Sequence, residues 1–80
     1  MDIRFVQTCG CCPEQYDAYL GDKYVGYVRE RGGSFTVEYP GKDDCERELL
    51  FSAYSDEGFS SQWMLKKARR AIWKKIISIL

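Results

Sequence analysis

The spacing of apolar side chains along the chain changes near residue 60, from every second position to every third or fourth. Before that point apolar and polar residues alternate in short runs, which is typical of strands with one buried face. The clearest runs cover residues 2–8, 16–20, 23–31 and 34–39. Residues 48–54 also alternate, with Leu49, Phe51 and Ala53 on one face, although residues 44–50 would also suit a short helix. The pattern therefore favours a strand there and predicts four to five strands.

Short turns separate these runs. Gly21-Asp22 and Gly32-Gly33 suit two-residue hairpin turns, because glycine tolerates positive φ. Proline lacks the N–H that a strand ladder needs, so Pro40-Gly41 ends the run before it. Tight hairpins join neighbouring strands antiparallel, and strict alternation places Tyr24, Gly26 and Val28 on one face of the third strand.

The C-terminal segment has the periodicity of an amphipathic helix, and Ser60 or Ser61 can cap its start. Its apolar stripe comprises Leu65, Ala68, Ile72, Ile76 and Ile79. We expect this stripe to cover one face of the sheet. The predicted fold is therefore α+β: an antiparallel meander of four to five strands with one C-terminal amphipathic helix packed on one face, forming a single domain over residues 1–80.

Length and composition agree with one small folded domain. The 80 residues are 45% hydrophobic and 15% aromatic, whereas disordered chains lack aromatic and β-branched residues. No apolar run reaches the roughly 18 residues of a transmembrane helix, and residues 1–5 lack the pattern of a secretory signal. We therefore expect a cytoplasmic protein whose four cysteines are reduced thiols.

The zero net charge hides a strong asymmetry. Residues 1–59 carry twelve acidic and six basic side chains, whereas residues 60–80 carry six basic and no acidic ones. The basic segment either faces solvent and pairs with the acidic remainder, or it meets an anion, a nucleic acid or an acidic partner.

Catalytic patterns are missing from the sequence. Histidine is absent, and no phosphate-binding glycine loop, nucleophile elbow or paired catalytic carboxylate motif occurs. The acidic residues Asp43, Asp44, Glu46 and Glu48 suit a solvated loop. These observations predict a binding protein and not an enzyme.

Cysteine gives the most distinctive local pattern. Cys9 and Cys12 form a C-x-x-C pair, with Cys11 between them and Cys45 far along the chain. Four thiolates can hold zinc in a tetrahedron, but structural sites usually have two separated pairs. A zinc site, a redox dithiol and ordinary reduced thiols all remain open, and no other cofactor is expected.

Two surfaces are candidates for binding a protein partner. The first is the basic side of the helix, where apolar residues stand among cations; its residues are Trp63, Lys66, Lys67, Arg70, Trp73, Lys74 and Ile77. The second is the sheet face opposite the helix, where we expect tyrosines from among Tyr16, Tyr19, Tyr24, Tyr27 and Tyr39, with Tyr19 and Tyr27 as the main candidates. Loops or a second protomer could equally cover the apolar residues of the helix. Cross-strand aromatic pairing could equally explain the tyrosines of the sheet.

Residues 14–37, EQYDAYLGDKYVGYVRERGGSFTV, resemble small uncharacterised proteins encoded by phages and prophages of Gram-positive bacteria. This resemblance implies an accessory protein that works in the bacterial host by binding and blocking host machinery, including defence complexes such as CRISPR-Cas.

Residues 24–35, followed by a strand and a helix, are similar to the three-stranded DNA-binding domain of plant ethylene-response factors and phage integrase arms. In that mode the sheet enters the major groove and arginines read bases, which implies Arg29, Arg31 and Arg47 here. A nucleic acid would otherwise use Lys66, Lys67, Arg70 and Lys74 of the helix. Acidic residues on the same strands (Glu30, Glu38, Glu46 and Glu48) oppose phosphate. Protein–protein binding is thus the leading hypothesis, with a nucleic-acid-binding module and a zinc-stabilised module as alternatives.

Overall fold

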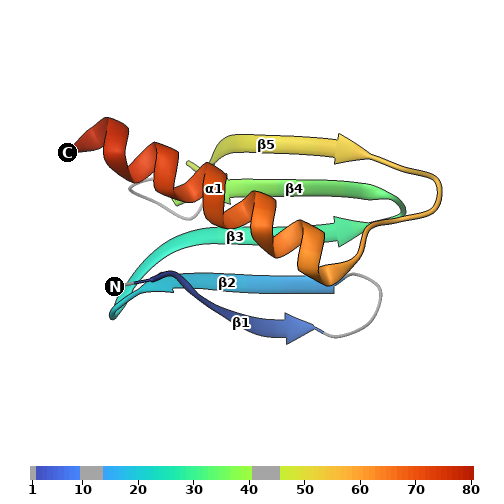
Figure 1. The fold of residues 1–80 in the computed structure, drawn as a ribbon, viewed down its shortest axis with the longest axis horizontal. Helices are drawn as coiled ribbons and strands as arrows, with labels where there is room; N and C mark the ends of the chain where they lie inside the picture. Colours follow the sequence, from blue (N-terminus) through green and yellow to red (C-terminus); the bar gives the residue numbers. More distant parts are fainter. Residues whose placement is uncertain (1, 10–13, 41–45) are drawn as a thin grey trace.

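The computed structural model of the protein describes residues 2–9, 14–40 and 46–80. It contains five strands and one helix: β1 (Arg4–Cys9), β2 (Glu14–Leu20), β3 (Lys23–Arg31), β4 (Ser34–Tyr39), β5 (Glu48–Tyr54) and α1 (Ser61–Ile79) (Figure 1). The strands form one antiparallel sheet in the order β1-β2-β3-β4-β5. The predicted α+β meander with a C-terminal helix is confirmed, and residues 48–54 form a strand.

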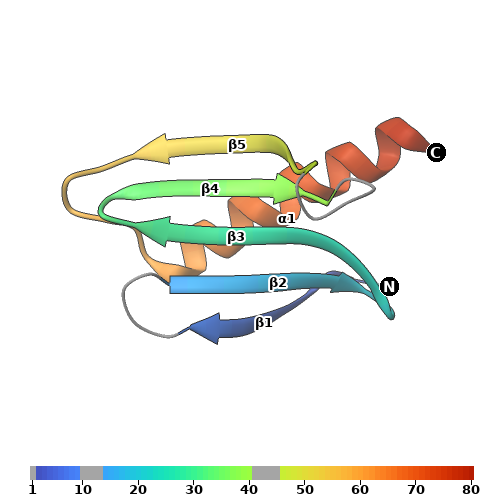
Figure 2. The ribbon, with the colours of Figure 1, turned by 180° about the vertical axis from the view of Figure 1, so that it is seen from behind.

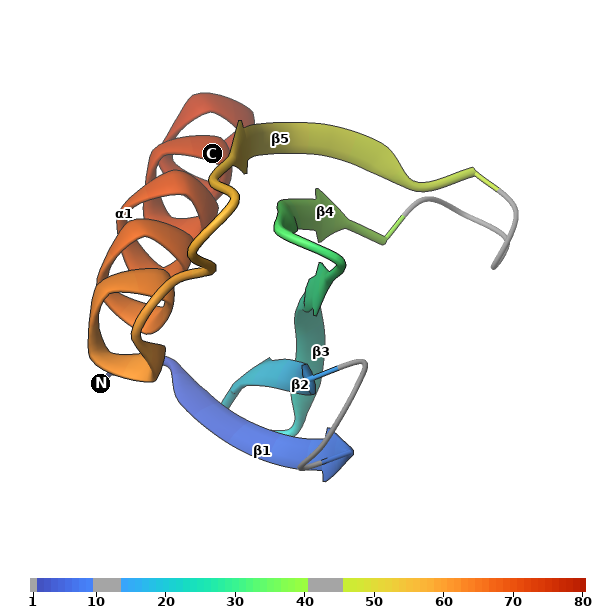
Figure 3. The same cartoon turned by 90° about the vertical axis from the view of Figure 1, so that its right-hand side faces the viewer.

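The sheet curves around the helix. Seen end-on, β1 and β5 bend toward α1, so that the helix lies on the concave side (Figure 3). The helix crosses the sheet diagonally and packs against β3, β4 and β5. The view from behind shows no element over the convex side of the sheet among the described residues (Figure 2). Within the described part of the chain, α1 thus covers the concave face of the sheet and leaves the convex face uncovered.

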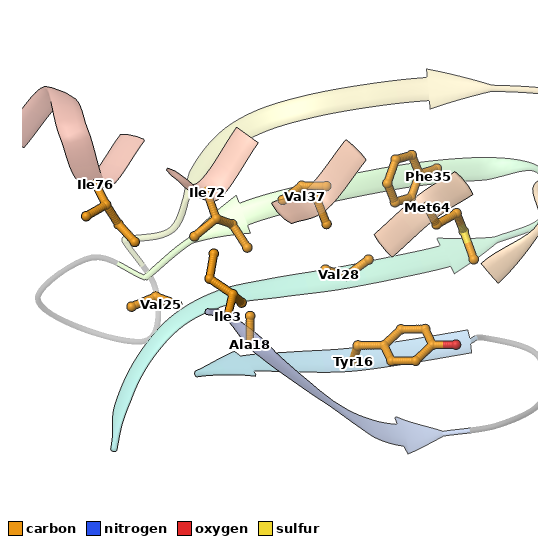
Figure 4. Close-up of a cluster of buried hydrophobic side chains, with 11 residues drawn as sticks. Ile3, Tyr16, Ala18, Val25, Val28, Phe35, Val37, Met64, Ile72 and Ile76 are labelled. Atoms are coloured by element: carbon orange, nitrogen blue, oxygen red, sulfur yellow. The ribbon is translucent and has the colours of Figure 1, made fainter. Parts of the chain in front are cut away.

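The core fills the space between the concave face and the helix (Figure 4). The buried residues are Ile3, Tyr16, Ala18, Val25, Val28, Phe35, Val37, Met64, Ala68, Ile72 and Ile76. The helical members are four residues apart, so they share one face of α1. The predicted stripe was wrong at both ends. At its start, Met64 is fully buried whereas Leu65 is only partly buried, and at its end Ile79 is 53% exposed. The C-terminal end of α1 extends past the strands beneath it (Figure 1).

A bulge in β3 changes which side chains enter the core. Ala18 pairs with Gly26 and Tyr19 pairs with Tyr24, which leaves Val25 as an extra residue. Val25 is 1% exposed and faces the helix, whereas Tyr24 turns to the convex face beside Tyr19. The prediction that Tyr24 shares a face with Gly26 was therefore wrong, because a bulge interrupts strict alternation.

A second bulge has the same effect in β5. Val37 pairs with Phe51 and Glu38 pairs with Leu49, so Leu50 is the extra residue. Leu50 packs against the core, and Leu49 is 57% exposed. The prediction that Leu49 shares the buried face of Phe51 was wrong for this reason.

The predicted turn and cap are observed. Gly32 and Gly33 have φ of 58° and 87°, the positive values that a tight two-residue hairpin requires. The Ser60 side chain accepts a 3.2 Å hydrogen bond from the Trp63 N–H, which makes Ser60 the N-cap. Among the described residues, no helix combines the length and the apolar character needed to cross a membrane.

Candidate partner-binding site

Three cations form a row along the solvent side of α1. Lys66, Arg70 and Lys74 are spaced four residues apart, and all three are exposed. None of them forms an ion pair within the described part of the chain. Their spacing is that of the buried stripe, so the helix has one apolar and one cationic line. We call these three residues the basic row.

Other helix cations have partners within the molecule. The Lys75 ammonium lies 2.8 Å from a Glu48 carboxylate oxygen, and the Arg69 guanidinium lies 3.2 Å from Asp2. A hydrogen bond from the Ile3 N–H, together with the charge of Arg69, lowers the pKa of Asp2 below its ordinary value. These pairs tie the helix to both edges of the sheet and leave the basic row as the unpaired part of its charge.

Trp63, which was predicted on the basic side of the helix, is partly buried and packs against the core. Its ring stacks on Phe59, with centroids 4.8 Å apart, and lies 5.7 Å from Phe35 and 6.4 Å from Phe51. The Lys67 ammonium lies 5.5 Å from the Trp63 ring centroid, a cation–π contact that leaves Lys67 half-buried. Trp63 therefore anchors the first turn of α1 to the sheet.

The remaining apolar candidates on the helix divide into two groups. Trp73 packs against the core, so its ring also has a structural role. Ile77 is 66% exposed and is joined by Ile79 and by Leu80, which is 96% exposed. These last three residues form an apolar tip at the end of α1, and Ile77 was the one member that was predicted as a binding residue.

A groove lies between α1 and β5. Its floor is apolar, with Leu50 and Phe51 from the strand and Ala71 from the helix, and its volume is about 430 Å³. The helix wall carries the cations Lys67, Arg70, Lys74 and Lys75, and Glu48 of β5, which also lines the groove, pairs with Lys75. We call this feature the basic groove. Sequence reasoning found its cations by helical periodicity but missed its floor, which depends on how the helix lies on β5.

A hollow of about 340 Å³ continues the basic groove along the helix. It is lined by Lys66, Lys67, Arg69 and Arg70. Two of these residues, Lys67 and Arg70, also line the groove, so the two depressions share one positive surface. The predicted cations Lys66, Lys67, Arg70 and Lys74 are therefore brought together at one site.

The two main tyrosine candidates on the convex face form cation–π contacts with arginines of the same chain. Tyr19 lies 5.1 Å beneath the Arg4 guanidinium, and Tyr27 lies 4.4 Å beneath that of Arg47. Tyr24 joins them on this face, with its ring 5.7 Å from Tyr19. These cation–π and ring contacts occupy the tyrosines within the molecule. Tyr16 and Tyr39, also considered for this face, pack on the concave side.

Burial and a neighbouring carboxylate give Tyr24 the largest pKa shift in the described residues. Its hydroxyl donates a 3.3 Å hydrogen bond to an Asp17 carboxylate oxygen. Desolvation, followed by the negative charge of Asp17, raises the pKa of Tyr24 to about 12. At physiological pH, Tyr24 is thus neutral and donates its hydroxyl proton to Asp17.

The arginines considered for nucleic-acid binding do not join the helix cations. Arg29 and Arg31 lie on the convex face, and Arg47 lies over Tyr27 on that face, whereas α1 lies on the concave side. Asp17 and Glu38 flank Tyr27 in the sheet, which places two carboxylates among these arginines. The structure therefore contains two separate cationic surfaces.

The cysteines considered as zinc ligands lie outside what the structure describes: Cys11, Cys12 and Cys45 entirely, and Cys9 in its side chain.

No protein-family model, curated protein or solved structure matches the chain. The candidate sites are therefore defined by their own geometry and charge.

Proposed function

We propose that the protein is a non-catalytic binding protein that holds an acidic, extended segment of a partner protein in the basic groove. The observation that supports this most strongly is the basic row. Two of its cations, Arg70 and Lys74, line the groove beside the apolar floor, and Lys66 lines the adjoining hollow. None of the three is neutralised within the described residues, even though the chain contains twelve acidic side chains.

Charge alone supplies too little affinity for such a complex. An exposed ion pair contributes about 0.2–1 kcal/mol, so three pairs with the basic row give at most about 3 kcal/mol. Burying one large aliphatic side chain against Leu50 and Phe51 adds about 1.5–3 kcal/mol. The favoured partner segment therefore combines carboxylates with apolar residues.

The position of the groove suits an extended conformation. β5 is the last strand of the sheet, so its outer edge has no strand partner among the residues described. An extended segment can add to such an edge through main-chain hydrogen bonds, with alternate side chains on the groove side. Alternating acidic and apolar residues would then meet the cations and the floor in turn.

A second copy of the chain is a poorer occupant. Pairing two β5 strands about a two-fold axis would put both helices on the same side of the joined sheet. The two sets of groove cations, including Arg70 and Lys74, would then repel each other. The resemblance of residues 14–37 to phage-encoded proteins instead leads us to propose a protein of a bacterial defence complex as the partner.

Nucleic acid is the second candidate, and the basic row is again the observation in its favour. The sequence pI of about 6.2 and the acidic remainder of the chain weigh against it. Titration with duplex and single-stranded DNA distinguishes the two candidates. Binding that is tight at low salt and falls steeply as salt rises would favour nucleic acid.

NMR titration with a synthetic peptide tests the proposal. The probe is an end-capped octapeptide of alternating glutamate and valine, and the matched control replaces each glutamate by lysine. We expect saturable amide shifts in β5 and along residues 66–78 with the acidic peptide only. Equal shifts with both peptides, or shifts confined to the convex face, would contradict the proposal.

A further inference from the structure

Two arginines and two hydroxyls face one another on the convex side of the β3–β4 hairpin. Arg29 pairs with Thr36 and Arg31 pairs with Ser34, so each arginine stands directly across from a hydroxyl residue. Side chains two residues apart on a strand share a face, which places all four on one side of the sheet. They line a hollow of about 260 Å³.

The donors in this hollow exceed the acceptors that the chain provides. The Nε of Arg29 is buried and has no hydrogen-bond partner among the described residues. Neither arginine forms an ion pair in the same part of the chain. On the neighbouring strands, Gln15 pairs with Arg29 and Ser52 pairs with Thr36, and neither Gln15 nor Ser52 carries a charge. No carboxylate within the described residues therefore neutralises either of the two guanidinium groups that line the hollow.

We propose that this hollow binds one phosphoryl group. One guanidinium group can donate two parallel hydrogen bonds to two oxygens of a phosphate. The Ser34 and Thr36 hydroxyls can donate to the remaining oxygens. A tetrahedral oxyanion accepts from all these directions at once.

The surrounding charges favour a single phosphate over a nucleic-acid strand. Two positions along β3 from Arg29, Tyr27 pairs with Asp17 on one side and Glu38 on the other. These two carboxylates flank the path that a longer polyanion would follow. A phosphodiester backbone needs several aligned cations, and its successive phosphates would meet these acids. The ligand is therefore inorganic phosphate or a small phosphomonoester. The hollow lies on the face opposite the basic groove, so this inference does not depend on the proposed function.

Backbone NMR titrations at constant ionic strength test the site, with inorganic phosphate and glycerol phosphate in separate arms and chloride as the reference. We expect saturable shifts of the amides of residues 29, 31, 34 and 36. Binding should weaken at least tenfold in Arg31→Gln and several-fold in Thr36→Val, and it should be unchanged in Lys23→Gln. Arg31 is exposed, and Thr36→Val keeps the shape of the side chain, so both variants should fold. The arm with the tighter binding identifies the source of the phosphoryl group.

Three results would overturn the inference. The first is a linear, unsaturated response that Arg31→Gln leaves unchanged. The second is a set of shifts that centres on the cations of α1. The third is tighter binding of a short DNA duplex than of phosphate through the same residues, which would assign the convex face to nucleic acid.

Discussion

Gly26 of β3 and Ile72 of α1 approach so closely that no side chain fits between them. A Cβ built on Gly26 would lie 2.4 Å from the Cδ1 and 3.1 Å from the Cγ1 of Ile72. Ile72 is fully buried, so its terminal methyl has little room to move aside. The missing side chain at Gly26 therefore sets the distance between helix and sheet.

A double-mutant cycle tests this contact. Gly26→Ala should lower the free energy of unfolding by about 1–3 kcal/mol, because it overpacks the core. Ile72→Val alone should cost about 0.5–1.5 kcal/mol. The double variant should lose less than the sum, since valine lacks the Cδ1 atom that clashes. Strictly additive losses in urea denaturation would show that the two residues do not restrain each other.

The corrected helix stripe predicts unequal effects of two isoleucines on the same helix. Ile72→Ala should lower the free energy of unfolding by about 2–5 kcal/mol, because it leaves a cavity in the core. Ile79 is 53% exposed, so Ile79→Ala should change this free energy by no more than about 0.5 kcal/mol. Thermal or urea unfolding measures both, and similar losses would restore Ile79 to the buried stripe.

The β3–β4 turn predicts a difference between adjacent glycines. Both have positive φ, so alanine at either position should cost about 1–2 kcal/mol. A Cβ on Gly33 would also lie 2.4 Å from the Ser55 carbonyl oxygen, whereas a Cβ on Gly32 meets nothing within 4 Å. The backbone must move to admit alanine at Gly33, which also threatens the 2.9 Å hydrogen bond from the Ser55 N–H to the Gly33 carbonyl. Gly33→Ala should therefore be the less stable variant in urea denaturation, and equal stabilities would argue against the contact.

The pKa of Tyr24 predicts a loss of stability at high pH. Folding raises this pKa from 10.0 to about 12, so the folded state favours the neutral phenol. The contribution of Tyr24 to stability is complete below pH 10 and is lost as pH rises toward 12. A tyrosinate absorbance titration of the wild type minus that of Tyr24→Phe should show a midpoint near the upper value. In Asp17→Asn the midpoint should fall only part of the way, because burial is the larger cause.

The topology was readable from the sequence because its signals are local. Glycine-containing turns and the change of apolar period near Ser60 each occupy a few neighbouring residues. The faces of Val25 and Leu50 were not readable, since each bulge is a property of two paired strands. One extra residue reverses the side on which its neighbours lie.

The candidate sites divide in the same way. Helical spacing alone was enough to align Lys66, Arg70 and Lys74. The burial of Trp63 depends on Phe35 and on other rings that are distant in sequence, so helical spacing misassigned it to the basic side. The register of the β3–β4 hairpin, which pairs Arg29 with Thr36, follows from the Gly32-Gly33 turn and was within reach of the sequence.

We propose that the cations of the basic groove bind an acidic protein segment. The most direct measurement is the affinity of a fluorescent, end-capped Glu-Val octapeptide for three proteins, measured by anisotropy. These are the wild type, the variant Arg70→Glu with Lys74→Glu, and the charge-matched control Arg4→Glu with Lys23→Glu. Reversing the charge at Arg70 and Lys74 replaces attraction of the peptide's glutamates by repulsion at two positions. The affinity of the groove variant should therefore fall about tenfold, whereas that of the control should change little. Equal affinities for the groove variant and the control would contradict the claim.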